Sequence, residues 1–178
     1  LAEEEAAGRA LVVDVINPVV EYTARQQKYK RIGVIGTKGT INSGTYVSKI
    51  IAKNPHVVVS SLATPMLVPM IEEGFIFDDI SNAIIRTYLS KPEISQIDSL
   101  ILGCTDYPII KNQISKYYNF SVDVIDSSRI VANHLRKILS DHDLLSQAVS
   151  GKNRFLVSEY TDYFQAISKL FFEEEIKL

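Results

Sequence analysis

The stretch LILGCTDYPIIKNQISKYY, residues 100–118, decides the predicted fold. An unbroken apolar run ends at Gly103, and a short polar turn then leads to a Tyr-Pro pair and a helical pattern. Proline is tolerated in the first turn of a helix, so the stretch predicts a strand over 97–103 and a helix over 107–118. The apolar run is continuous rather than alternating, which is typical of a strand covered on both faces.

The same order of strand and helix recurs along the chain and predicts an α/β protein with a mainly parallel sheet. The other predicted strands are 10–16, 31–36, 56–61, 121–126 and 154–158. The other predicted helices are 18–27, 41–54, 64–74, 78–91, 127–142 and 161–172. For the helix over 41–54 we expect an N-cap at Asn42 or Ser43 and a stop at Asn54-Pro55. The polar stretch 141–153 predicts a loop.

Composition excludes several classes of protein. Hydrophobic residues make up 46% and charged residues 22%, and the net charge of −2 gives no electrostatic argument for nucleic acid or an anionic membrane. The sequence has no apolar run of bilayer length and no signal-peptide pattern, and its one cysteine excludes an internal disulfide. We therefore expect a soluble, cytoplasmic protein. The opening LAEEEAAGRA resembles the second half of an amphipathic helix, so we expect the chain to be part of something longer.

Three predicted strands end in polar turns, and these are the candidate ligand sites. They are GTKGT (36–40), SSLATP (60–65) and GCTD (103–106). In parallel sheets ligands bind at the carboxyl ends of strands, where backbone N–H groups suit an anionic group such as a carboxylate. GTKGT lacks phosphate-loop spacing, because Lys38 lies between the glycines. It is either such a site or an ordinary glycine-bounded turn.

Cys104 allows two interpretations. A free cysteine is usually a small buried hydrophobe. A thiol at a helix N-terminus instead has a lowered pKa and is reactive. The position of Cys104 between a strand and a helix favours the reactive thiol. Asp106 could relay protons, but its charge would raise the pKa of a nearby thiol.

Other patterns point to no further chemistry. Glu72 and Glu73 form an acidic pair that is solvated in the simplest interpretation. The three histidines lack metal-ligand spacing, so we predict no metal; we also find no lysine in a pyridoxal-phosphate context and no G-x-S-x-G motif. The C-terminal stretch 163–178 predicts a packed helix with a solvated tail, or a helix that binds a partner.

Five segments together resemble the aspartate/glutamate racemase family, and within it the glutamate racemases. They are IGVIGTKGTINSGTY (32–46), ATPMLVPMIEEG (63–74), LILGCTDYPII (100–110), VIDSS (124–128) and FLVSEYTDYFQAISKLF (155–171). The third is similar to the family's second cysteine motif, Gly-Cys-Thr-His-Tyr-Pro, except at Asp106. The family's Asp-Ser loop, Pro-Tyr-Gly loop and first catalytic cysteine, in Cys-Asn-Thr, are absent from these 178 residues.

The resemblance implies a fold of two similar α/β/α domains with mainly parallel sheets, facing each other across the active site. Residues 17–124 would form the second domain nearly complete. Residues 1–16 would be the end of the first domain, and 125–178 the C-terminal return to it. The chain would then be a C-terminal portion that lacks the N-terminal catalytic half of a homodimeric protein.

The resemblance also implies a reaction: interconversion of L- and D-glutamate without a cofactor, for peptidoglycan synthesis. One thiolate removes the α-proton of glutamate and an opposite thiol returns a proton. The implied catalytic residues are Cys104, Asp106 and Glu72, and the implied substrate-binding residues are Thr37, Thr40 and Thr105. With one thiol where the reaction needs two, we expect the chain alone to be inactive.

Two alternatives stay open. Aspartate-racemase relatives have an acidic residue in the motif, as Gly-Cys-Thr-Glu, so Asp106 is also compatible with racemisation of aspartate or a related amino acid. The other alternative is a non-catalytic remnant that binds a partner through an exposed half-domain face. All three interpretations leave out nucleic acid and membranes as partners.

Overall fold

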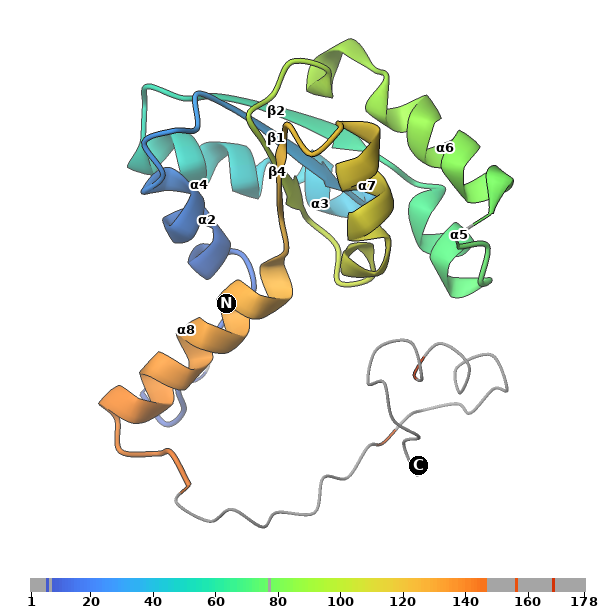
Figure 1. Ribbon diagram of the computed structural model, residues 1–178. Coiled ribbons are helices and arrows are strands. Elements are labelled where there is room, and N and C mark those ends of the chain that lie inside the picture. The colour runs from blue at the N-terminus through green and yellow to red at the C-terminus, as the bar shows by residue number, and fades with distance from the viewer. Residues whose placement is uncertain (1–5, 7, 77, 147–155, 157–167, 169–178) are drawn as a thin grey trace.

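The computed structural model describes residues 8–76 and 78–146, together with Ala6, Leu156 and Ser168 (Figure 1). The elements in chain order are α2 (Asn17–Ala24), β1 (Arg31–Gly36), α3 (Lys38–Asn42), α4 (Thr45–Lys53), β2 (Val58–Ala63), α5 (Leu67–Glu72), α6 (Asp79–Leu89), the 3-10 turn η1 (Pro92–Ile94), β3 (Ser99–Leu102), the 3-10 turn η2 (Tyr107–Ile110), α7 (Lys111–Tyr117), β4 (Asp123–Ile125) and α8 (Ser127–Asp141). Strands and helices alternate, which confirms the predicted α/β class.

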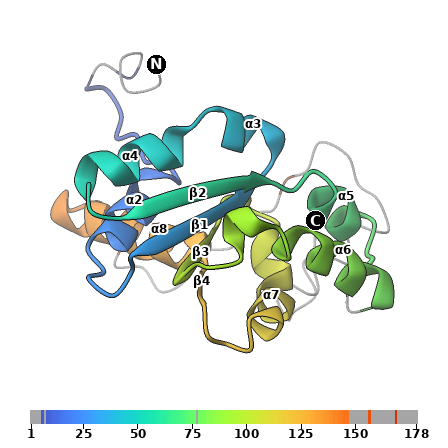
Figure 2. The same cartoon turned by 90° about the horizontal axis from the view of Figure 1, so that it is seen from above.

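The four strands form one parallel sheet in the order β2-β1-β3-β4 (Figure 2). Ile32 of β1 is paired with Val59 on one side and with Ser99 on the other. The chain therefore winds outward from β1 in both directions. The carboxyl ends of β1 and β3 flank the point where the winding reverses, which is where ligands bind in open parallel sheets.

Helices cover both faces of the sheet (Figure 1). One core cluster includes Leu100 and Leu102 together with residues of α5, α6 and α7. The other includes Ile101 and packs against α2 and α4. Successive residues of a strand point to opposite faces, so each residue of this apolar run enters one core or the other. This explains the unbroken run of apolar residues, and truncating Leu100 to alanine would cost about 2–5 kcal/mol.

The helix predicted over 41–54 is two helices, α3 and α4, separated at Gly44. Gly44 has a φ of 62° and is the N-cap of α4, so the expected cap at Asn42 or Ser43 is wrong. A left-handed residue breaks the helix, and glycine adopts that conformation without a steric penalty. Asn42 instead ends α3. The predicted stop is confirmed, because α4 ends at Lys53 and Asn54 is its C-cap.

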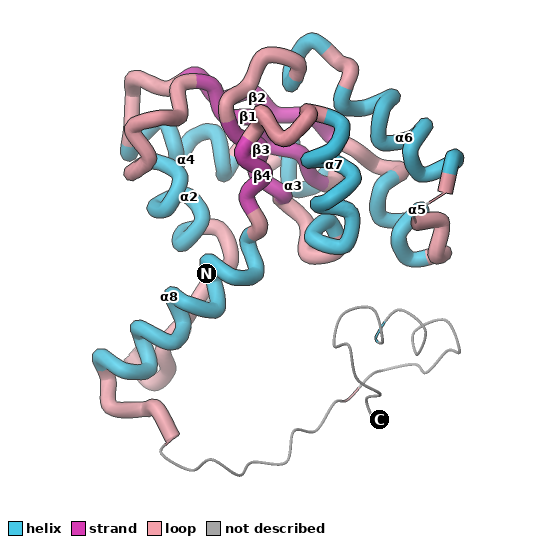
Figure 3. Tube along the Cα trace, in the orientation of Figure 1, coloured by secondary structure: helices cyan, strands magenta, loops and turns pink. Residues whose placement is uncertain are grey.

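The strand predicted over 10–16 is also wrong. Figure 3 draws this segment as loop, and residues 8–11 and Val13 line a cavity together with Leu135, Ile138 and Leu139 of α8. A strand requires a neighbouring strand to pair its backbone groups, and among the described residues none lies beside this segment. Its large apolar side chains Leu11, Val12 and Val15 remain partly exposed.

The strand predicted over 31–36 is confirmed with its bounds, and the other predicted elements within the described residues are confirmed with shifted ends. The helix predicted over 107–118 begins as the 3-10 turn η2 before α7. The predicted strand 154–158 and helix 161–172, and most of the opening ten residues, lie outside the described part. No helix within that part is long and apolar enough to cross a bilayer.

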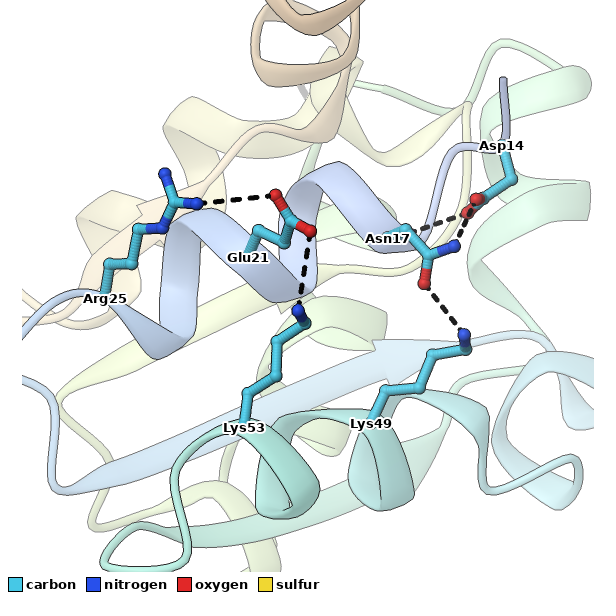
Figure 4. A network of polar contacts seen from close by, with 6 residues as sticks. All are labelled: Asp14, Asn17, Glu21, Arg25, Lys49 and Lys53. Carbon is cyan, nitrogen blue, oxygen red and sulfur yellow. Dashed lines mark hydrogen bonds and ion pairs between the residues drawn. The ribbon is translucent and has the colours of Figure 1, made fainter. Parts of the chain in front are cut away.

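A polar network joins the start of α2 to α4 (Figure 4). The Asp14 carboxylate accepts hydrogen bonds from the backbone of Ile16 at 2.8 Å and of Asn17 at 2.7 Å. Asn17 in turn accepts a hydrogen bond from Lys49 at 2.8 Å. Burial acts to raise the pKa of Asp14, but the hydrogen bonds outweigh it and the pKa is lowered. The network fixes the direction in which the chain enters α2.

Candidate active site

Two glycines bring the turns after β1 and β3 into close contact. The Gly103 N–H donates to the Ile35 carbonyl at 2.8 Å. A Cβ on Gly103 would lie 2.8 Å from the same carbonyl oxygen, and one on Gly36 would lie 3.3 Å from the Gly103 oxygen. Thr40 lies over both glycines, since its Cγ2 is 3.2 Å from the Cβ position of Gly36 and 3.6 Å from that of Gly103. Larger residues would force the two turns apart.

The turn after β1 holds the two threonines that the resemblance implied for substrate binding. The Thr37 and Thr40 hydroxyls are 3.0 Å apart. Thr37 also caps α3 by accepting a hydrogen bond from the Thr40 backbone at 3.3 Å. Both side chains are half-buried, so one pair of hydroxyls is presented at the carboxyl edge of the sheet.

The turn after β3 carries Cys104, half-buried, with its Sγ 3.7 Å from Asp106 Oδ2, which accepts the S–H. Burial raises the pKa of the Cys104 thiol, and the Asp106 charge raises it further, against the opposing effect of the Asp106 and Thr105 backbone N–H groups. The predicted lowering is therefore wrong, while the predicted effect of Asp106 is confirmed. The segment after Cys104 begins as a four-residue 3-10 turn, so no α-helix starts there to favour the thiolate.

A pocket of about 280 Å³ opens beside the thiol. Its wall combines residues from the turn after β3, from the segment before α2, from α4 and from the first turns of α8. The lining residues are Val15, Tyr46, Leu102, Gly103, Cys104, Thr105, Ser127, Ser128, Val131 and Ala132. Cys104 and Thr105 thus share one cavity with groups that lie far from them in the sequence.

The sequence-based site residues are only partly brought together. Cys104, Thr105 and Asp106 lie in one turn, and Thr40 lies against the adjoining glycine. Glu72 is the last residue of α5; it is exposed and outside the lining of the pocket.

Sequence reasoning missed Tyr46, Ser127 and Ser128 as pocket residues. Tyr46 is buried, and burial followed by the nearby Asp14 charge raises the pKa of its hydroxyl. The two serines follow β4, so the rule that ligands bind at the carboxyl ends of strands could have found them. Tyr46 lies in the segment 32–46 that carries the family resemblance, but the resemblance gave it no role, and its place in the pocket depends on how α4 packs.

Within the described ranges, no group of three or more His, Cys, Asp or Glu side chains is arranged to hold a metal. The fold and the site together define a class: a parallel α/β protein with one thiol at the carboxyl edge of its sheet, beside a small pocket.

Comparison with known proteins identifies the family. Residues 8–135 match the family described as Asp/Glu/Hydantoin racemase, and the chain belongs to that family. It is 36% identical over 174 residues to a glutamate racemase of Chlorobaculum parvum, covering 97% of this chain and 64% of that protein. Over 166 residues it is 37% identical to a glutamate racemase of Aquifex aeolicus, covering 93% of this chain and 61% of that protein. The chain thus spans less than two thirds of the length of these relatives.

Solved structures agree with the fold. The glutamate racemase of Francisella tularensis subsp. tularensis SCHU S4, determined in complex with D-glutamate, has a TM-score of 0.83 and is 36% identical, covering 93% of this chain and 61% of that one. A glutamate racemase isoform of Bacillus anthracis has a TM-score of 0.84 and is 29% identical, covering 98% of this chain and 67% of that one.

Proposed function

We propose that this chain supplies one of the two proton-transferring thiols of a glutamate racemase. The observation that carries the proposal is the Cys104 thiol, half-buried at the carboxyl edge of β3 beside a pocket of about 280 Å³. The likeness to curated glutamate racemases over almost the whole chain supports glutamate as the substrate.

Each polar group at the edge of the sheet receives a role. Cys104 exchanges a proton with the α-carbon of the substrate. The hydroxyls of Thr37, Thr40 and Thr105 bind its carboxylate and ammonium groups. Asp106 holds the thiol proton between turnovers, supported by the 3.7 Å contact. A catalytic role for Glu72 rests on the resemblance alone, because its exposed carboxylate lies outside the pocket lining.

The electrostatics of the site fit one direction of proton transfer. The α-proton of an amino acid is a very weak acid, so the site has to stabilise a carbanionic transition state and exclude water. A thiol with a raised pKa is protonated at neutral pH, which suits Cys104 to give a proton to the α-carbon. Removing a proton requires the thiolate, so alkaline pH favours the reverse direction.

The sequence contains one cysteine, and two-thiol chemistry needs a second. We propose that the second thiol comes from outside these 178 residues and that this chain alone does not interconvert the enantiomers. On the same likeness, we propose that the complete enzyme is a cytoplasmic homodimer that supplies D-glutamate for peptidoglycan. Residues 17–124 would form one of its domains, and 1–16 and 125–178 would belong to the other.

Deuterium exchange at the α-carbon tests this proposal. L- and D-glutamate are incubated separately with the chain in D₂O and followed by NMR. We expect slow exchange of one enantiomer without interconversion, and no exchange by a Cys104→Ser variant, which has no thiol. Interconversion by the chain alone would contradict the one-thiol proposal, and equal exchange by the serine variant would contradict the role of Cys104.

A second candidate substrate is aspartate, favoured by the acidic residue at position 106. The complete enzyme would then have a higher kcat/KM for aspartate than for glutamate. An Asp106→His variant should shift that ratio toward glutamate. A ratio that the variant leaves unchanged would remove the argument for aspartate.

A further inference from the structure

Two buried hydroxyl groups lie beneath the turns that form the candidate site. Tyr107 and Thr64 are both 0% exposed. The Tyr107 hydroxyl lies 2.7 Å from Thr64 Oγ1 and 3.2 Å from the Thr64 carbonyl oxygen. None of the roles given above uses either residue.

The two hydroxyls connect the ends of three strands. Thr64 directly follows β2; its backbone N–H donates to the Gly36 carbonyl at 2.9 Å, and its hydroxyl donates to the same oxygen at 3.2 Å. Tyr107 lies three residues after Cys104, and its N–H donates to the Cys104 carbonyl at 3.3 Å. The hydrogen bonds therefore run from the end of β1, through the residue after β2, to the turn that carries the thiol.

This connection spans a gap that the sheet itself cannot close. β2 and β3 are not neighbours, because β1 lies between them, so no backbone ladder joins their ends. An unpaired buried hydroxyl is unfavourable, so Tyr107 and Thr64 hold each other in one geometry. In the arrangement that satisfies both groups, Thr64 donates to Gly36 while Tyr107 donates to Thr64.

We infer that Tyr107 and Thr64 are positioning residues that hold the Cys104 turn down against the turn of Thr37 and Thr40. The inference rests on the proposed function only in that Cys104 is the proposed catalytic group. When the tether is lost, the turn over 103–107 lifts and the thiol becomes more exposed. In the complete enzyme the same loss would lower kcat.

Cys104 is the only cysteine in the sequence, so its alkylation reports on this turn alone. The titratable groups around it are Asp106 on the same turn, Tyr46 across the pocket and Tyr107, with Tyr88 close to Tyr107. Burial is the largest influence that raises the pKa of the thiol, so exposing the turn should lower that pKa. The thiolate is the reacting form, so alkylation at neutral pH should become faster.

The test is the rate of alkylation by iodoacetamide as a function of pH, for the chain and for a Tyr107→Phe variant. We expect an apparent pKa below that of the unmodified chain and about a 5-fold faster reaction at neutral pH, the factor that matches one hydrogen bond of about 1 kcal/mol. Thr64→Val should also lower the apparent pKa and speed alkylation. Thr64→Ser keeps the hydroxyl and should show the profile of the unmodified chain. The double variant should not exceed Thr64→Val, because the hydrogen bond between the two hydroxyls is already lost in that variant, together with the bond from Thr64 to the Gly36 carbonyl.

Tyr118→Phe is the matched control. Tyr118 is also a buried tyrosine, and its hydroxyl donates to the Ile94 carbonyl at 2.9 Å, away from the thiol. This variant should lose comparable stability in thermal unfolding and keep the alkylation profile. The inference is overturned if Tyr107→Phe leaves the profile unchanged, or if Tyr118→Phe shifts it equally.

The readout separates the two proposals, because alkylation needs no turnover. If the tether variants shift the alkylation profile but the unmodified chain shows no deuterium exchange, the inference about Tyr107 and Thr64 stands and the proposed reaction is rejected. If the chain shows deuterium exchange but the tether variants leave the alkylation profile unchanged, the proposed reaction stands and the inference about Tyr107 and Thr64 is rejected. If one tether variant fails to fold, the other removes the same hydrogen bond from the opposite partner.

Discussion

Asp106 acts against the ionisation of the thiol beside it. Its carboxylate accepts the Cys104 S–H and repels the thiolate charge, and both effects favour the protonated sulfur. The two backbone N–H groups of the turn act in the opposite direction. One side chain two residues away thus influences the pH at which Cys104 becomes nucleophilic.

Replacing Asp106 with asparagine should therefore lower the pKa of Cys104. The charge is removed while the size of the side chain is nearly kept, so the thiolate forms at a lower pH. The pH profile of Cys104 alkylation measures the shift. An Asp79→Asn variant, which removes an exposed carboxylate on α6, is the control and should leave the profile unchanged. An unchanged or higher pKa in the Asp106 variant would contradict the role given to its charge.

The glycine between β3 and Cys104 should tolerate no side chain. A Gly103→Ala variant places its Cβ 2.8 Å from a backbone oxygen that cannot move away alone, so unfolding should cost about 1–3 kcal/mol less. The matched variant is Gly39→Ala, whose Cβ would meet only the Thr37 hydroxyl at 4.0 Å and which lies within α3. It should be neutral or stabilising by about 0.5–1 kcal/mol. Urea unfolding measures both, and equal effects would refute the close approach.

At the scale of single residues, the sequence predicted where the main site residues lie but not the pKa of the thiol. The strand-end rule placed Cys104 at the carboxyl edge of the sheet and grouped Thr37 with Thr40. The direction of the thiol pKa could not be predicted, because it depends on burial of Cys104 against the core cluster that includes residues of α5, α6 and α7. Those contacts come from packing between segments distant in sequence, which no local pattern encodes.

At the scale of single elements, a local sequence pattern predicts the observed helix or strand only where the backbone conformation and the neighbouring elements permit it. Gly44 divides the helix predicted over 41–54, because its left-handed conformation separates two segments that share one apolar pattern. The β-branched run over 10–16 has strand propensity but lacks a partner strand among the described residues. β1 had both propensity and partners, and its predicted bounds are those observed.

The start of α2 depends on Asp14 more than on the ion pairs further along the helix. Asp14→Ala removes hydrogen bonds to two backbone N–H groups and should lower the free energy of unfolding by about 1 kcal/mol. Glu21→Ala removes only exposed contacts with Arg25 at 3.7 Å and Lys53 at 3.4 Å and should cost less than about 0.5 kcal/mol. Urea unfolding at neutral pH compares the two variants, and an equal cost would reject this ranking.

The stability that Asp14 contributes should depend on pH. Because the pKa of Asp14 is lowered in the folded protein, its contribution is fully present above the ordinary value of 3.8 and is lost as pH falls through the lower folded value. The difference between the unmodified chain and Asp14→Ala should therefore shrink in acid. A difference that grows below that pH would show that the sign is wrong.

Across the whole molecule, stability should be distributed unevenly. None of the described residues of α8 is buried, and Leu135 on this helix is 40% exposed, whereas the central strands are almost fully buried. We expect the backbone amides of α8 to exchange hydrogen through local opening, much faster than those of β1 and β3. Hydrogen exchange followed by mass spectrometry measures this, and equal protection of α8 and β3 would contradict it.

The central position of β1 also affects the order in which the sheet can form during synthesis. During synthesis β1 and β2 are made early, and they can pair as soon as both are available. The other side of β1 has to wait until β3 has been made, which happens only after α3, α4, β2, α5 and α6. Throughout that interval a strand destined for the middle of the sheet has an open edge, where another nascent chain could pair with it. The order β2-β1-β3-β4 thus makes the arrival of the cysteine-bearing segment the step that closes this edge.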